Sequence, residues 1–89
     1  MLKLDPGRQA RKFLDQVPLK HARQLAAKLL QLRQNPYPSD AKQLKGEPYW
    51  SASAGEYRII YRVEGDTLRI AVVGKHNDDD VYRQLRRLT

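Results

Sequence analysis

The 89-residue sequence contains no cysteine and only two histidines, one tryptophan, one methionine and one phenylalanine. Without cysteine no disulfide can crosslink the chain, and two histidines are too few for a structural zinc site. No apolar run approaches the roughly 20 residues that cross a bilayer, and the N-terminal segment lacks the apolar core of a secretory signal. We therefore expect a cytoplasmic protein with no metal site, no cofactor and no membrane partner.

Acidic residues are also scarce: 10 Asp and Glu stand against 17 Lys and Arg, which gives a net charge of +7 and a pI near 10.0. Such an excess on a small protein favours an anionic partner such as nucleic acid or an acidic protein. The alternative is that the charge only keeps the protein soluble. The length predicts a single domain over residues 1–89, with no room for a separate substrate domain.

The first half of the sequence has helical periodicity. Leu2–Asp5 alternate as in a short edge strand, and Asp5 and Pro6 are typical of a helix N-cap and first helical position. Two apolar stripes with helical spacing follow, separated by Pro18, and predict a helical hairpin that packs on a core. The stripes contain Ala10, Phe13, Leu14 and Val17, and then Leu19, Ala22, Leu25, Ala26, Leu29 and Leu32.

The second half changes to a period of two. After a break at Asn35–Asp40 and a basic loop over Lys42–Pro48, the pattern predicts strands over residues 49–53, 57–64 and 67–75. Gly65-Asp66 suits a type II′ hairpin turn. A last helix begins after Asn77–Asp80. The predicted fold is α+β: an N-terminal strand and a helical hairpin packed on an antiparallel meander, with a C-terminal helix.

The predicted hairpin separates apolar and basic side chains. If Glu64 pairs with Thr67 and the register continues unbroken, Arg62 lies opposite Arg69, where like charges repel. An anion bound on this face would explain the arrangement, and the alternative is that Glu56 and Glu64 offset the charge. The apolar face would contain Tyr57, Ile59, Tyr61, Val63, Leu68, Ile70 and Val72, and the basic face Arg58, Arg62, Arg69 and Lys75.

Several stretches resemble the RelE/ParE toxin superfamily, and the resemblance extends over nearly the whole chain. The most specific is Gly55-Glu56-Tyr57-Arg58-Ile59-Ile60-Tyr61, and the others are Asn35-Pro36, Ala41–Gly46, Val73–His76 and Asp80–Tyr82. The sequence looks closer to the RelE-like branch, which implies a RelE-like fold and a ribosome-dependent mRNA endonuclease. Such an enzyme cuts without metal, by attack of a ribose 2′-OH on the adjacent phosphate. The implied partners are an acidic antitoxin, the ribosome and mRNA, with operator DNA reached only through the antitoxin complex.

The resemblance also implies roles for individual residues. Arg58 would hold the scissile phosphate, and Tyr82 would orient the cleaved nucleotide. Ser51 and Ser53 occupy positions where family members often carry a basic pair, so His76 becomes the candidate proton acceptor because imidazole titrates near neutrality. The candidate RNA-binding residues are Lys42, Lys45, Arg62, Arg69 and Lys75.

Other readings of these residues stay open. Arg58 is also compatible with an ordinary surface ion pair, Tyr82 with packing, and His76 with a hydrogen bond to the neighbouring aspartates. At the level of function, Ser51 and Ser53 fit a ParE-like inhibitor of DNA gyrase that has no nuclease chemistry. A non-catalytic module that only binds an antitoxin is the third possibility.

Overall fold

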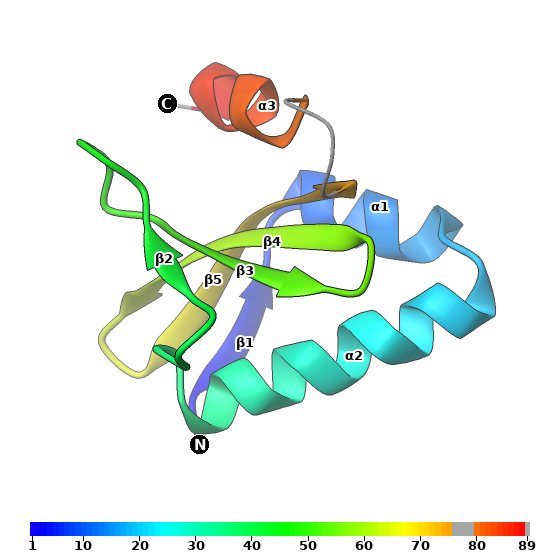
Figure 1. Ribbon diagram of the computed structural model, residues 1–89, viewed down its shortest axis with the longest axis horizontal. Coiled ribbons are helices and arrows are strands. Elements are labelled where there is room, and N and C mark those ends of the chain that lie inside the picture. Colours follow the sequence, from blue (N-terminus) through cyan, green and yellow to red (C-terminus); the bar gives the residue numbers. More distant parts are fainter. Residues whose placement is uncertain (76–79, 89) are drawn as a thin grey trace.

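The computed structural model describes residues 1–75 and 80–88, which form one mixed sheet between helices (Figure 1). The sheet order is β1-β5-β4-β3-β2, with β1 parallel to β5 and the other neighbours antiparallel. The strands are β1 (Lys3–Pro6), β2 (Lys42–Gln43), β3 (Trp50–Ala54), β4 (Tyr57–Glu64) and β5 (Thr67–Lys75). The helices are α1 (Arg8–Gln16), α2 (Leu19–Gln34) and α3 (Asp80–Leu88). The predicted α+β architecture is confirmed, with β2 as an additional strand inside the predicted loop.

The start of α1 differs from the prediction. Asp5 and Pro6 do not cap the helix, because both belong to β1, where they pair with Arg69 and Ile70 of β5. Gly7 is the N-cap and makes no side-chain cap hydrogen bond. Its N–H instead donates to the Ile70 carbonyl (2.9 Å), which a Cβ on Gly7 would approach to 3.1 Å. Pairing with the sheet therefore overrides the local capping signal, and proline is tolerated because β1 is an edge strand.

Helices α1 and α2 cover one face of the sheet. Pro18 separates them as predicted, at the N-cap of α2. Only part of the predicted α2 stripe is buried, because Leu19 and Ala26 lie about 100–120° around the helix from Leu25 and remain exposed. The main core cluster on this face contains Ala10, Leu25, Leu29, Leu32, Ala52, Ala54, Tyr57, Ile59, Tyr61, Leu68, Ile70 and Val73.

The β4–β5 hairpin follows the predicted register only near its turn. Gly65, the first residue of the turn, has a φ of 58°, whereas the φ of Asp66 is not positive. A type II′ turn requires this combination. Pairs run as predicted from Glu64 with Thr67 to Tyr61 with Ile70. A β-bulge then inserts Ala71 as an extra residue, and pairing resumes one position later.

The bulge reverses the predicted faces at the end of β5. Val73 rather than Val72 joins the main core cluster, and Val72 points to the opposite face. Lys75 pairs with Tyr57, so it lies on the face covered by α1 and α2 and not beside Arg58. The prediction of Lys75 on the basic face is therefore wrong, because one inserted residue shifts each later side chain to the other side.

Helix α3 packs on the opposite face, which leaves the sheet between α2 and α3 in Figure 1. A second apolar cluster joins Ile60 and Val72 of the sheet to Val81 and Leu85 of α3. Gly74 permits the close approach, because a Cβ there would lie 2.4 Å from Cγ1 of Val81. The predicted basic face is thus partly covered by α3.

The free edge of β5 is closed by a side chain. Strand β1 pairs with β5 only as far as Ile70. Beyond that point the Gln9 side chain donates to the Val73 carbonyl and accepts from the Val73 N–H, both at 2.9 Å. Within residues 1–75 and 80–88, no helix combines the length and the hydrophobicity needed to cross a bilayer.

Candidate functional site

A cleft of about 530 Å³ opens on the face of the sheet that α3 partly covers. It brings together residues from β2, β3, β4 and α3 and from the segment around β2. Its lining is Asp40, Lys42, Gln43, Leu44, Lys45, Ser51, Ser53, Arg58 and Tyr82. Arg58, Tyr82, Lys42 and Lys45, which sequence reasoning singled out separately, therefore lie around one cavity.

Strand alternation explains why these side chains meet. Ser53 pairs with Arg58, and Ser51 pairs with both Lys42 and Ile60, so all of them lie on one face. The intervening residues Ala52 and Ala54 belong to the main core cluster on the other face. Ser51 and Ser53 therefore form part of the cleft wall, at the positions where the resemblance predicts a basic pair.

Arg58 and Tyr82 form the most specific contact in the cleft. Nη1 of Arg58 donates a hydrogen bond to the Tyr82 hydroxyl, and the guanidinium carbon lies 5.7 Å from the centroid of the tyrosine ring. Both side chains are half-buried. A guanidinium in this position can offer paired N–H donors to two oxygens of a phosphate, while the ring offers a surface for a base.

Lys42 and Lys45 give the cleft an excess of positive charge. Both are exposed, and among the described residues neither lies within ion-pair distance of a carboxylate. The one acid in the lining, Asp40, binds Lys28 of α2 (Nζ to Oδ2, 2.8 Å). The Lys28 hydrogen bond lowers the pKa of the Asp40 carboxyl, so Asp40 stays ionised and its charge is offset from outside the cleft.

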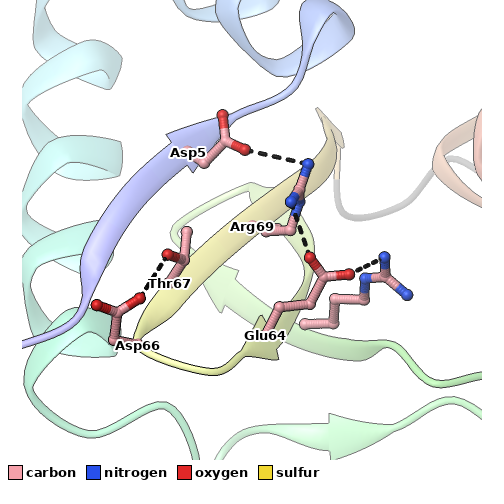
Figure 2. Close-up of polar contacts among 6 residues, drawn as sticks. Asp5, Glu64, Asp66, Thr67 and Arg69 are labelled. Atoms are coloured by element: carbon pink, nitrogen blue, oxygen red, sulfur yellow. Dashed lines mark hydrogen bonds and ion pairs between the residues drawn. The ribbon is translucent and has the colours of Figure 1, made fainter.

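Arg62 and Arg69 lie outside the cleft lining and are held by acids. They face each other across β4 and β5 as predicted, and Glu64 binds both. Arg69 also binds Asp5 of β1 at 3.3 Å, which Figure 2 shows as a chain of contacts across three strands. The alternative in which Glu64 offsets this charge is therefore realised.

Glu56, the second acid expected to offset the arginine charges, does not contribute to this ion-pair cluster. Glu56 lies 3.4 Å from Nδ1 of His21 on α2 and not beside the arginine pair. Asp5 takes its place, although its sequence position before Pro6 is typical of a helix cap.

Two predicted site residues remain, Lys75 and His76. Lys75 lines a separate hollow of about 250 Å³ on the face covered by α1 and α2, together with Phe13, Gln16, Val17, Pro18 and Tyr57. His76 lies outside the described residues. Among the residues that are described, no group of three or more His, Asp or Glu side chains is arranged to hold a metal ion.

Asp40 is the member of the site that sequence reasoning missed. It stands in a segment of turn formers, and nothing in the local pattern points to Lys28, which is 12 positions earlier on α2. Only the path of the loop brings the two together.

The α+β fold is the one that the resemblance to the RelE/ParE toxin superfamily implies. The family model described as "ParE toxin of type II toxin-antitoxin system, parDE" matches residues 5–80. The chain belongs to this ParE toxin family and is a toxin of a type II toxin–antitoxin system. No curated protein sequence matches it.

Solved structures share the fold at low sequence identity. The isolated E. coli RelE toxin is 24% identical, with a TM-score of 0.76 and 100% of each chain covered. A chain of the archaeal RelE–RelB complex from Pyrococcus horikoshii OT3 is 24% identical, with a TM-score of 0.73 and coverage of 83% of this chain and 93% of that one. A chain of the YoeB–YefM complex from Staphylococcus aureus is 22% identical, with a TM-score of 0.69 and coverage of 85% and 98%.

Proposed function

We propose that this toxin inhibits translation by cutting mRNA on the ribosome, with the cleft as its active site. The observation that supports this best is the Arg58–Tyr82 hydrogen bond inside a cleft whose rim carries Lys42 and Lys45. Cleavage by a ribose 2′-OH builds negative charge on a five-coordinate phosphate, and preorganised cations stabilise that charge. Arg58 would bind the phosphate oxygens, Tyr82 would orient the nucleotide, and the two lysines would attract the RNA strand.

Proton transfer needs a base that the serines do not supply. A serine hydroxyl does not accept a proton near neutral pH, so Ser51 and Ser53 leave the cleft without the basic pair that the resemblance predicts. We assign the proton acceptor to His76, the next residue in the sequence after β5, because imidazole is the side-chain group best suited to accept a proton near neutral pH. The mechanism uses no metal ion or other cofactor.

The expected protein partner is an acidic antitoxin. The structures with this fold include RelE with RelB and YoeB with YefM. The net charge of +7 complements an acidic chain that folds on binding. Operator DNA would be reached only through that complex.

A ParE-like inhibitor of DNA gyrase is the second candidate. The match to the ParE family model and the two serines in the cleft favour it. The basic cleft around Arg58 favours the nuclease, because binding a topoisomerase requires no phosphate site.

The test is cleavage of mRNA on purified, programmed ribosomes, mapped by primer extension. We expect a cut in the A-site codon with the wild-type protein, its loss with folded Arg58→Ala, and its retention with Arg23→Ala. Arg23 is a matched control because it is exposed on α2, away from the cleft. A cut that persists in Arg58→Ala contradicts the phosphate-binding role. No cut with the wild type, together with inhibited plasmid supercoiling by gyrase, would establish the second candidate. If the cut is seen, His76→Ala is the next variant.

A further inference from the structure

The outward face of α1 is basic. Ala10 and Phe13 point inward and pack in the main core cluster. The opposite face carries Arg8, Arg11 and Lys12 at positions i, i+3 and i+4, all three exposed. We call these three residues the α1 cation surface. Because neighbours at this spacing have Cβ atoms about 5–6 Å apart, the three charges form one compact group.

This group, like Lys42 and Lys45 of the cleft, has no carboxylate partner among the described residues, whereas several other cations do. Lys3, Lys28, Arg62 and Arg69 each bind a carboxylate. No residue of the α1 cation surface lies within ion-pair distance of a described acid, although Asp15 stands on the same side of the helix. Holding like charges together costs free energy, and a bound polyanion would recover it.

The chemistry of the surrounding surface favours a nucleic acid. A hollow of about 480 Å³ is lined by the α1 cation surface with Pro6 and Asp15, and Pro6 is the one apolar residue in that lining. A protein partner needs an apolar centre in its interface, and a membrane needs apolar side chains to insert. A phosphate backbone needs neither, because Lys and Arg bind it through charge and hydrogen bonds alone.

We infer that the α1 cation surface binds the phosphate backbone of double-stranded RNA, as a second contact separate from the cleft. The separation follows from packing: α1 covers the face of Ile59 and Val73, whereas Arg58 and Ser53 lie on the opposite face. A single RNA strand that lies in the cleft, on one side of the sheet, therefore does not also reach the α1 cation surface. The inference rests on the proposed function only in taking RNA rather than DNA as the polymer.

The experiment measures binding of the full-length protein to a blunt-ended RNA duplex by fluorescence anisotropy over a series of KCl concentrations. The test variant is Arg8→Gln/Arg11→Gln. The control is Lys20→Gln/Arg23→Gln, which removes the same charge from exposed positions on α2. We expect the test variant to reduce the slope of log Kobs against log salt by about 2 and the low-salt affinity about tenfold or more. The control should stay close to wild type.

Three results would overturn the inference. Equal losses in the test and control variants would mean that binding follows net charge and not this surface. An unchanged slope in a test variant with wild-type circular dichroism would remove α1 from the interface. Tighter binding of a DNA duplex of the same sequence would reject RNA as the ligand. None of these depends on ribosomal cleavage, so failure of the proposed function is observed separately.

Discussion

Arg58 of β4 and Tyr82 of α3 are joined by a hydrogen bond from the guanidinium to the phenol oxygen. The contact links the sheet to the last helix at the wall of the cleft. The position of Arg58 therefore depends on how α3 docks, and changes in the packing of α3 should alter the chemistry of the cleft.

Tyr82 contributes a hydroxyl and a ring, and two variants separate them. Tyr82→Phe removes the oxygen that accepts from Arg58 but keeps the ring near the guanidinium carbon. We expect ribosomal cleavage to fall about 10- to 150-fold in Tyr82→Phe, as for the loss of one hydrogen bond to a charged group, and further in Tyr82→Ala. Single-turnover cleavage on programmed ribosomes measures both. Equal rates for the two variants would show that the ring has no role.

Gly74 controls the docking of α3. A Cβ at this position would lie 2.4 Å from Cγ1 of Val81, well inside normal contact, so Gly74→Ala must displace the helix. We expect a loss of about 1–3 kcal/mol in the free energy of unfolding, with reduced cleavage because Tyr82 moves. Urea unfolding followed by Trp50 fluorescence measures the first effect. Gly74→Ala/Val81→Ala removes the clashing methyl and should restore part of the cleavage, whereas no rescue would place the defect elsewhere.

Asp40 should make stability depend on pH in the acid range. Its carboxyl has a pKa below the ordinary 3.8, chiefly through the Lys28 hydrogen bond, so the folded state binds its proton less readily than the unfolded state. The stabilisation is present above pH 3.8 and is lost as the pH falls through the lower folded-state pKa. Urea unfolding at several pH values should show Asp40→Asn about 0.5–1 kcal/mol less stable at neutral pH and level with wild type in acid.

A matched control for Asp40 is Asp66→Asn. Asp66 pairs with Lys3 at 3.3 Å, but both side chains are largely exposed, whereas Lys28 is mostly buried. We expect almost no stability change from Asp66→Asn at any pH, because exposed pairs contribute little. If the difference in free energy of unfolding between Asp40→Asn and wild type persists at the lowest pH, the carboxylate charge is not its cause.

Glu64 offsets the repulsion between Arg62 and Arg69. Glu64→Gln leaves two like charges opposite each other, and we expect a loss of roughly 0.5–1 kcal/mol that shrinks as salt is added. Chemical unfolding at low and high NaCl measures it. The double variant Glu64→Gln/Arg69→Gln also removes the repulsion, so its loss should be smaller than the sum of the single losses. Strict additivity would show that the three charges do not interact.

The sequence predicted the elements well, because helical and strand periodicities differ and Pro18 and Gly65 mark the turns. It failed at the end of β5 for a physical reason. Ala71, Val72 and Val73 form a continuous apolar run, since one face packs on the helical hairpin and the other on α3. Such a run carries no mark of which residue faces which side, so the extra residue of the bulge was invisible and Lys75 was placed wrongly.

The candidate site was predictable only in part. Arg58 and Tyr82 came from family-like motifs, and Lys42 and Lys45 from a basic loop, but no local pattern showed that they share one cleft. Ion pairs neutralise some of the cations and leave others without a carboxylate. These pairs join segments that are distant in the sequence, such as Lys28 with Asp40 and Arg69 with Asp5. These pairings depend on the tertiary path of the chain.

Gln9 has a consequence for how copies of this protein behave toward one another. A strand that runs past its neighbour exposes N–H and C=O groups, and such an edge is a template on which a strand of another molecule can assemble. The Gln9 amide occupies both backbone groups of Val73, where β5 continues beyond β1. One side chain on α1 thus ends the hydrogen-bonding ladder at this point, so that the backbone of Val73 is not available to pair with a strand of another molecule.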